Sequence, residues 1–190
     1  MNKEVLTILE ETGAFLTGHF LLSSGKHSAQ YVQCAKVFQH PKKAEEAMAG
    51  VVLALQGFGI TKVVGPAMGG IIVAYELARQ LQVEAIFTER HEGEMKLRRG
   101  FTIEPGEKVL IAEDVITTGK STKETWQLLE HLGAKVVGVA SLVDRRGPGV
   151  FEDLPVYSAI HVDFVVHEEG ACPVCKEGIP LVKPGSRVAV

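Results

Sequence analysis

The chain has 190 residues, of which 46% are hydrophobic and 23% are charged. These values are ordinary for a globular protein and exclude a disordered or collagen-like chain, and the length suits one domain with a sizeable core. Its 20 basic and 23 acidic side chains give a net charge of −3, so no overall positive charge draws it to nucleic acid. Any anionic ligand must therefore be held by local groups, such as backbone amides or a metal.

The number of cysteines and the length of the apolar runs indicate the cellular compartment of the protein. Three cysteines are too few for a disulfide framework, and the first residues lead into an amphipathic stretch unlike a signal peptide. The longest apolar run, from Gly69 to Ala78, contains Glu76 and is shorter than the ~18 residues that span a membrane. We therefore expect a cytoplasmic protein with no membrane partner.

The first 56 residues predict two helices separated by an irregular segment. Apolar residues at helical spacing predict a helix over residues 2–12, ending at Gly13. Residues 15–38 mix glycine, serine and histidine with single apolar positions, which favours short strands and turns. Pro41, a favoured first-turn residue, begins a second helix over 41–56.

After Gly57, short β-branched runs alternate with helical patterns. The expected strands lie at 62–65, 84–89, 108–114, 135–143 and 156–160, and the expected helices at 70–81 and 122–132. Several strands are continuously apolar, which is typical of strands buried on both faces of a parallel sheet. A charged, hairpin-like excursion occupies 90–99, and the tail after the last strand has no clear periodicity.

The most informative segment is Val109-Leu-Ile-Ala-Glu-Asp-Val-Ile-Thr-Thr-Gly-Lys-Ser-Thr122. A buried strand ends in two adjacent acids, and a hydroxyl-rich loop then opens a helix. Ligands of open α/β sheets bind at this end of the strands. The amides of Thr117 through Ser121 at a helix N-terminus favour a phosphate group. The loop is therefore interpreted as a cradle for a phosphomonoester.

Glu113 and Asp114 would repel a phosphate unless they hold something else, such as vicinal hydroxyls or a hydrated Mg²⁺. A ribose 5-phosphate satisfies all of these groups. The alternative is that the two acids only end a strand and that Thr117 only caps the next helix. The spacing matches neither the P-loop nor the dinucleotide-binding fingerprint.

The segment Val109–Thr122 resembles the phosphoribosyl-pyrophosphate (PRPP) motif of the type I phosphoribosyltransferases: apolar residues, two acids, two apolar residues, then T-[TA]-G-x-[ST]. The resemblance implies an α/β fold, with a mostly parallel twisted sheet flanked by helices. It also implies that residues 1–190 form a single domain. Within it, residues of roughly 41–160 form the core, and residues of roughly 1–40 and 160–190 form a small hood that covers the active site.

Four further segments resemble the orotate phosphoribosyltransferases of that family: Gly18–Tyr31, Gly65–Gly70, Leu142–Gly147 and Pro180–Ser186. The implied reaction is Mg²⁺-dependent transfer of ribose 5-phosphate from PRPP to orotate. Its products are orotidine 5′-monophosphate and pyrophosphate, on the route to UMP. The resemblance also implies a homodimer, with Mg²⁺ held mainly by PRPP.

The resemblance assigns three overlapping sets of residues. The catalytic candidates are Glu113, Asp114, Arg90 and Lys96. The PRPP-binding candidates are Glu113, Asp114, Val115, Ile116, Thr117, Thr118, Gly119, Lys120, Ser121, Ala67, Met68, Gly69, Arg98 and Arg99. The orotate-binding candidates are Thr117, Arg145, Tyr31 and Val32.

Chemistry supports part of this assignment, and plainer interpretations stay open. A guanidinium is the best single partner for a carboxylate, which favours Arg145 as the anchor for orotate. The alternatives are a surface arginine at 145, core packing for Tyr31, and a solvated hairpin over 90–99.

Two other functions compete with orotate transfer. A purine phosphoribosyltransferase would need a stacking aromatic residue soon after the phosphate loop, and it would leave the segment at 18–31 unexplained. A PRPP-binding regulator without catalysis would be expected to carry a nucleic-acid-binding element, and no basic face or extra helix-turn-helix is evident.

The remaining candidates are one cysteine pair and one histidine. Cys172-Pro-Val-Cys175 is a lone C-x-x-C, and a structural zinc needs four ligands. A second pair of ligands could come only from Cys34, His161 or His167, which lie at no recognisable spacing. We therefore expect a compact turn with reduced thiols. Among the histidines, His91 in the charged segment is the candidate for proton transfer.

Overall fold

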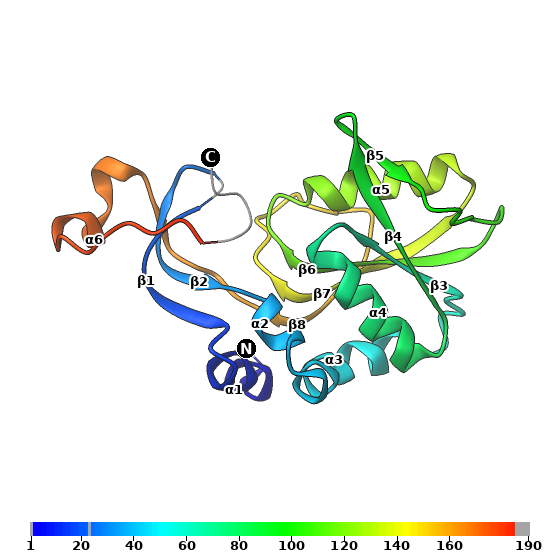
Figure 1. Cartoon of the computed structure of the whole chain (residues 1–190), viewed down its shortest axis with the longest axis horizontal. Coiled ribbons are helices and arrows are strands. Elements are labelled where there is room, and N and C mark those ends of the chain that lie inside the picture. The colour runs from blue at the N-terminus through cyan, green and yellow to red at the C-terminus, as the bar shows by residue number, and fades with distance from the viewer. Residues whose placement is uncertain (1, 23, 185–190) are drawn as a thin grey trace.

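The computed structural model describes residues 2–22 and 24–184. Its elements form a larger and a smaller sheet with helices around them (Figure 1). The helices are α1 (Lys3–Glu11), α2 (Ala35–Phe38), α3 (Pro41–Leu55), α4 (Gly69–Leu81), α5 (Lys120–His131), the 3₁₀ turn Glu169–Ala171 and α6 (Pro173–Lys176). The strands are β1 (Phe15–Leu21), β2 (His27–Val32), β3 (Lys62–Pro66), β4 (Glu84–His91), β5 (Glu94–Leu97), β6 (Lys108–Ile116), β7 (Lys135–Asp144), β8 (Val156–His161) and β9 (Val166–His167).

The larger sheet has the order β5-β4-β3-β6-β7-β8. All of its neighbouring strands are parallel except β5, which runs antiparallel to β4. The chain passes from β3 to β4 on one side and then returns to place β6 on the other side of β3. Ligands of such sheets bind where the strand order reverses, outside the carboxyl ends of the strands. The predicted fold class is confirmed, and this topology places the expected site at the ends of β3 and β6.

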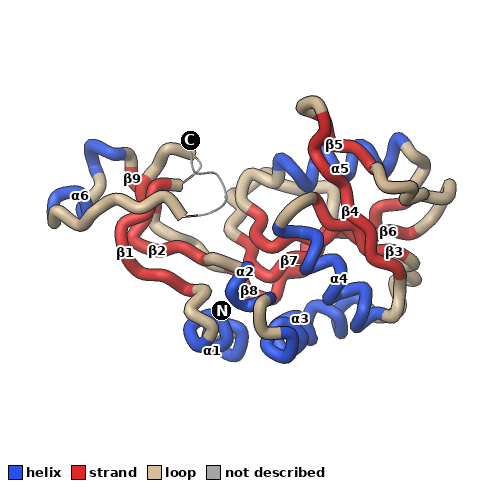
Figure 2. Tube along the Cα trace, viewed as in Figure 1, coloured by secondary structure: helices blue, strands red, loops and turns tan. Residues whose placement is uncertain are grey.

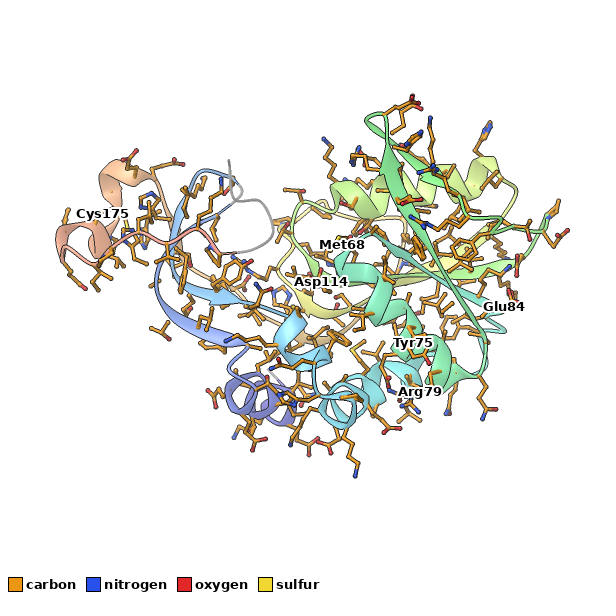
Figure 3. All side chains as sticks on the ribbon, in the orientation of Figure 1. Met68, Tyr75, Arg79, Glu84, Asp114 and Cys175 are labelled. Atoms are coloured by element: carbon orange, nitrogen blue, oxygen red, sulfur yellow. The ribbon has the colours of Figure 1, made fainter. Side chains whose placement is uncertain are left out.

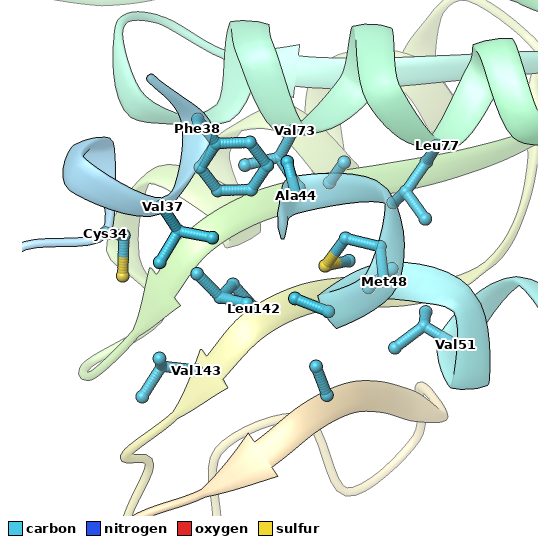
Figure 4. Packing of buried hydrophobic residues seen from close by; sticks show 14 of the residues in the cluster. Cys34, Val37, Phe38, Ala44, Met48, Val51, Val73, Leu77, Leu142 and Val143 are labelled. Atoms are coloured by element: carbon cyan, nitrogen blue, oxygen red, sulfur yellow. The ribbon is translucent and has the colours of Figure 1, made fainter. Parts of the chain in front are cut away.

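Two apolar layers hold the larger sheet between its helices. Leu110 and Ala112 of β6 face the cluster that includes α3 and α4, whereas Val109 and Ile111 face the cluster that includes Leu129 of α5. The alternation follows from the two-residue period of a strand. Figure 4 shows part of the first cluster, in which side chains from α2, α3 and α4 pack over β7.

The smaller sheet consists of β1, β2 and β9, all antiparallel, and lies beside the larger one (Figure 2). The C-terminal segment runs along its edge, because Leu21 N–H donates to the Val182 carbonyl at 2.9 Å and Val182 N–H donates to the His19 carbonyl at 2.8 Å. α6 packs at the far end of this sheet from the larger one. Segments more than 140 residues apart in sequence thus meet here.

The predicted elements agree with the structure closely, and three differences stand out. The strand expected at 84–89 continues to His91, and residues 94–97 pair with it as β5, so the hairpin-like segment expected at 90–99 is part of a longer β-hairpin. Helices α2 and α6 and strand β9 were not predicted, because each is too short to show a period. Helix α5 begins two residues earlier than expected, at Lys120. No described helix combines the length and the apolar character that a membrane crossing requires.

Candidate active site

The turn after β3 lies against the acid pair at the end of β6. A Cβ atom on Gly69 would lie 2.5 Å from Asp114 Oδ2, and one on Gly70 would lie 2.6 Å from the Ala112 carbonyl oxygen. Only glycine permits this close approach. The predicted pyrophosphate turn, Ala67-Met68-Gly69, is therefore next to Asp114, and Figure 3 shows Met68 and Asp114 at the same edge of the sheet.

A cavity of about 620 Å³ opens at the carboxyl end of β6 and the start of α5. This volume is typical of a small-molecule site. The cavity is lined by Leu21, Leu22, Tyr31, Arg90, Glu113, Val115, Ile116, Thr117, Thr118, Gly119, Lys120, Ser121, Thr122, Lys183 and Pro184. The whole predicted phosphate loop, Thr117 through Ser121, thus faces one cavity.

The backbone of the phosphate loop suits an anion. Gly119 has φ +67°, and a Cβ atom there would lie 2.6 Å from the Phe151 ring, so the position requires glycine. Helix α5 follows with no side-chain cap on its N-terminus. The first amides of a helix have no partner within it, and its dipole favours negative charge there. A phosphate at this point would satisfy both requirements.

The acid pair is shielded from solvent, which disfavours its charged form. Burial raises the pKa of Glu113 to about 8, and the adjacent Asp114 adds to the shift. Burial also raises the pKa of Asp114, although the Val115 N–H donates a hydrogen bond to its Oδ1 at 2.8 Å. No described cationic side chain contributes to either shift. Carboxylates in this state suit hydroxyl donors or a hard cation such as Mg²⁺, which prefers oxygen ligands.

Two consecutive arginines after β7 have different surroundings. Arg146 is occupied, because its Nε donates to Asp144 at 2.9 Å and its Nη1 donates to the Val150 carbonyl at 3.1 Å. The Arg145 guanidinium stacks 4.3 Å from the centre of the Phe164 ring, and its buried Nε has no hydrogen-bond partner among the described residues. Burial lowers the pKa of Arg145. Arg145 is half-buried and is not among the residues that line the cavity. A buried Nε without a partner is unusual, which favours a ligand carboxylate there.

Tyr31 and Val32, the other residues predicted to contact the base, face different surroundings. Tyr31 lines the cavity, with its ring 5.7 Å from that of Phe20. Burial raises the pKa of Tyr31. The Val32 side chain is buried in the apolar cluster of α3 and α4, so only its backbone is left to contact a ligand.

Of the four predicted loop cations, only Arg90 lines the cavity. Arg90 donates to the Gly93 carbonyl at 2.6 Å and pairs with Glu124 of α5. The other three lie on the hairpin and pair within it. Lys96 pairs with Glu92 and Glu94, and Arg98 and Arg99 pair with Glu89. His91 is near Glu92, also away from the cavity. A role for these side chains with substrate stays a prediction.

Sequence reasoning missed one cation in the cavity. Lys183 lines it together with Leu21, Leu22, Thr122 and Pro184. The residues around Lys183 show no periodicity, and their position depends on the pairing of Val182 with β1. Of the segments that carried the resemblance, Ser23, Gly185 and Ser186 lie outside the described residues.

Cys34 and His161 lie apart from Cys172 and Cys175. The Cys34 thiol contacts the Asp114 carbonyl at 3.4 Å in the core of the larger sheet, and His161 is near Asp144 and Asp163. The side chains that meet Cys172 and Cys175 are His19 and His27. A sequence separation of about 150 residues gives no recognisable spacing, so the sequence does not indicate this cluster.

Comparison with known proteins decides the family. Residues 33–172 match the phosphoribosyl transferase domain. An orotate phosphoribosyltransferase from a Thermoanaerobacter species is 52% identical over 186 residues, covering 98% of each chain. The chain belongs to the phosphoribosyltransferase family, among the orotate phosphoribosyltransferases.

Solved structures of this family share the fold but differ in the base. The crystal structure of orotate phosphoribosyltransferase from Aeropyrum pernix aligns with a TM-score of 0.71 and 25% identity, over 83% of this chain and 93% of that one. An adenine phosphoribosyltransferase from Rhodothermus marinus aligns with a TM-score of 0.66 and 25% identity, over 83% and 99%. Base specificity must therefore come from side chains around the shared site.

Proposed function

We propose that this phosphoribosyltransferase transfers the ribose 5-phosphate group of PRPP to orotate. The bond between the anomeric carbon and the pyrophosphate oxygen breaks, and a bond from that carbon to a ring nitrogen of orotate forms. The products are orotidine 5′-monophosphate and pyrophosphate. The observation that carries the choice of base is the half-buried Arg145 beside Tyr31, whose buried Nε has no partner among the described residues and suits a pyrimidine carboxylate.

The phosphoribosyl half of the substrate fits the loop and the acid pair. The 5-phosphate would accept hydrogen bonds from the amides of Thr117 through Ser121 at the start of α5. Glu113 and Asp114 would then lie by the ribose. As the glycosidic bond breaks, the anomeric carbon gains positive charge, and nearby carboxylates stabilise it.

The Mg²⁺ that the family implies fits the same acids. Glu113 and Asp114 offer hard oxygen atoms that are buried without a cation among the described residues. They would help to hold a metal that is bound mainly by PRPP. When bound, Mg²⁺ neutralises charge that develops on the departing pyrophosphate.

The pyrophosphate half would lie toward the turn at Ala67–Gly69 and the β4–β5 hairpin. Arg90 already lines the cavity, whereas Lys96, Arg98 and Arg99 would reach it only if the hairpin moved toward the cavity. Glu92 and Glu94, the partners of Lys96, are exposed, whereas Glu89, the partner of Arg98 and Arg99, is 18% exposed. Ion pairs made by exposed cations such as these contribute only ~0–1 kcal/mol. A ligand with several negative charges would compete well for them, and closure would exclude water.

The assembly and the compartment belong to the same proposal. Met68, Ile72 and Tyr75 lie at positions i, i+4 and i+7 of the α4 region and are 79%, 46% and 63% exposed. An apolar stripe of this kind favours a homodimer with the stripe at its interface. Residues 1–40 and 160–190 would form a hood over the core at 41–160. The three free cysteines suit a cytoplasmic location.

The proposed function is tested by following the loss of orotate absorbance with PRPP and Mg²⁺, with adenine and hypoxanthine as alternative bases. We expect turnover with orotate alone. Turnover with a purine but not with orotate would replace the proposal with a purine phosphoribosyltransferase. PRPP binding without turnover of any base would indicate a regulator.

A further inference from the structure

Four side chains with metal-ligating atoms meet at the far end of the smaller sheet from the active site. His19 comes from β1, His27 from β2, and Cys172 and Cys175 from the start of α6. Their ligand atoms all lie within 4.8 Å of one another. His19, His27 and Cys172 are at most 3% exposed. Figure 3 shows Cys175 well separated from Asp114.

The spacing of these atoms is that of a tetrahedral metal site. Zinc bonds of ~2.0–2.1 Å to nitrogen and ~2.3 Å to sulfur place neighbouring ligand atoms ~3.3–3.8 Å apart. His19 Nε2 is 3.0 Å from His27 Nδ1, 3.5 Å from Cys175 Sγ and 3.6 Å from Cys172 Sγ. Cys175 Sγ is 3.2 Å from His27 Nδ1. Small shifts would bring all four atoms onto one ion.

Hydrogen bonding alone does not satisfy this cluster. His19 Nδ1 is 2.8 Å from the Ile179 carbonyl, which can only accept, so Nδ1 carries the proton and Nε2 has a single lone pair. Two thiols and His27 Nδ1 all approach that one lone pair. A cation at the centre accepts four lone pairs at once. The Ile179 contact is also the kind of outer hydrogen bond that orients a metal-bound histidine.

We propose that His19, His27, Cys172 and Cys175 bind a structural Zn²⁺ ion. Two neutral imidazoles and two thiolates match the ligand preference of zinc, and four protein ligands leave no open position for catalysis. The two thiolate charges balance the 2+ of the ion, so the burial of the cluster costs little. The ion itself would contact no substrate.

The position of the ion gives it a defined task. It joins both long strands of the smaller sheet to the segment that follows β9. From α6 the chain passes through Ile179, whose carbonyl holds His19, to Val182 on β1 and then to Lys183 in the cavity. The ion, at the end of the smaller sheet away from the active site, therefore helps to position the segment that places Lys183 in the cavity.

The first test is the metal content of the intact protein, purified under reducing conditions without chelator or affinity metal. We expect about one Zn²⁺ per chain by inductively coupled plasma mass spectrometry. Protein stripped of metal and loaded with Co²⁺ should show thiolate-to-cobalt charge transfer and the visible bands of a tetrahedral site. These measurements need no variant, so they do not depend on whether a mutated chain folds.

Variants then locate the ion. Cys175→Ser and His27→Gln should lower the Zn²⁺ content at least tenfold and increase cleavage by protease within 165–184. Cys34→Ala and His167→Gln are the matched controls, because they remove a thiol and a histidine outside the cluster, and both should keep the metal. Turnover is not the readout, so failure of this proposal is distinguishable from failure of the proposed function.

Three outcomes would overturn the site. The first is wild-type protein that holds less than a tenth of an equivalent of Zn²⁺ after incubation with the metal and a thiol-free reductant. The second is a Co²⁺ spectrum without thiolate charge transfer. The third is a Cys172–Cys175 disulfide in protein freshly isolated without oxidant, detected by alkylation and mass spectrometry.

Discussion

The two sheets of this protein are stabilised by different means. The larger sheet has apolar clusters on both faces, with Leu110, Ile111 and Leu129 fully buried. The smaller sheet has three strands, and its fully enclosed side chains include His19, His27 and Ser28. A sheet of this size buries little apolar surface and needs another source of stability. The proposed zinc ion would be that source.

The difference matters because the active site has walls from both regions. The larger sheet supplies Glu113 and the phosphate loop, whereas the smaller region supplies Tyr31 and Lys183. The first wall rests on a packed core and should be rigid without ligand. The second depends on a few polar contacts. Five predictions test this contrast, from the largest expected effect to the smallest.

Truncating a core side chain of the larger sheet should cost the most. Leu129→Ala removes a fully buried side chain of α5, and such changes cost about 2–5 kcal/mol of unfolding free energy. The control is Leu181→Ala in the smaller region, where the side chain is 44% exposed and the loss should stay below about 0.5 kcal/mol. Urea titrations measure both. Equal losses would show that the two regions are packed alike.

Neutralising an acid should reduce turnover without harm to the fold. Asp114→Asn removes a buried carboxylate proposed to stabilise the ribose, and turnover should fall about 10²-fold or more. Asp153→Asn, on an exposed loop, is the matched control and should keep normal turnover. Steady-state kinetics with orotate and circular dichroism are the measurements. A normally active Asp114→Asn enzyme would remove Asp114 from the mechanism.

Arg145→Ala should weaken orotate binding selectively. The guanidinium has a free buried Nε, and loss of its pairing with a carboxylate should cost about 2 kcal/mol, or about 30-fold in affinity. PRPP affinity should change much less. Isothermal titration with each ligand measures the two effects. If both affinities fell equally, Arg145 would be a structural residue.

The pH dependence of the free energy of unfolding should report the titration of Glu113. In the unfolded chain its pKa is near 4.5, whereas in the fold it is about 8. Between these values the folded state binds more protons, so the free energy of unfolding falls as pH rises from about 4.5 to about 8. Glu113→Gln should remove this decline and be more stable than wild type at pH 8. A Glu113→Gln protein that keeps the full decline would assign the titration elsewhere.

The hairpin cations should act on turnover more than on orotate affinity. Lys96 pairs with the exposed Glu92, and Arg98 pairs with the partly buried Glu89. If they meet the pyrophosphate as its charge grows, alanine at either position should lower kcat with little change in orotate affinity. Proteolysis within 90–99 should also slow when PRPP and Mg²⁺ are added. A double alanine variant with full activity, or a hairpin that already resists proteolysis without ligand, would show that these residues are only part of a solvated surface.

The sequence alone was enough for the larger sheet and the phosphate loop. Helices such as 41–55 and strands such as 108–116 show their apolar period within one segment. The acid pair and the loop are also contiguous, so Glu113 through Ser121 could be placed together before any fold was known. Local spacing determines local structure, and this half of the site is local.

Tertiary structure decided everything that joins distant segments. It distinguished Arg145 from Arg146, which are adjacent in sequence but differ in partners, and it placed Lys183 in the cavity. It also brought His19 and His27 to Cys172 and Cys175. A single histidine on a strand forms no periodic pattern, and the sequence around it does not indicate which distant side chain it contacts. The physical reason is that such contacts depend on how the chain returns along β1, which no short segment specifies.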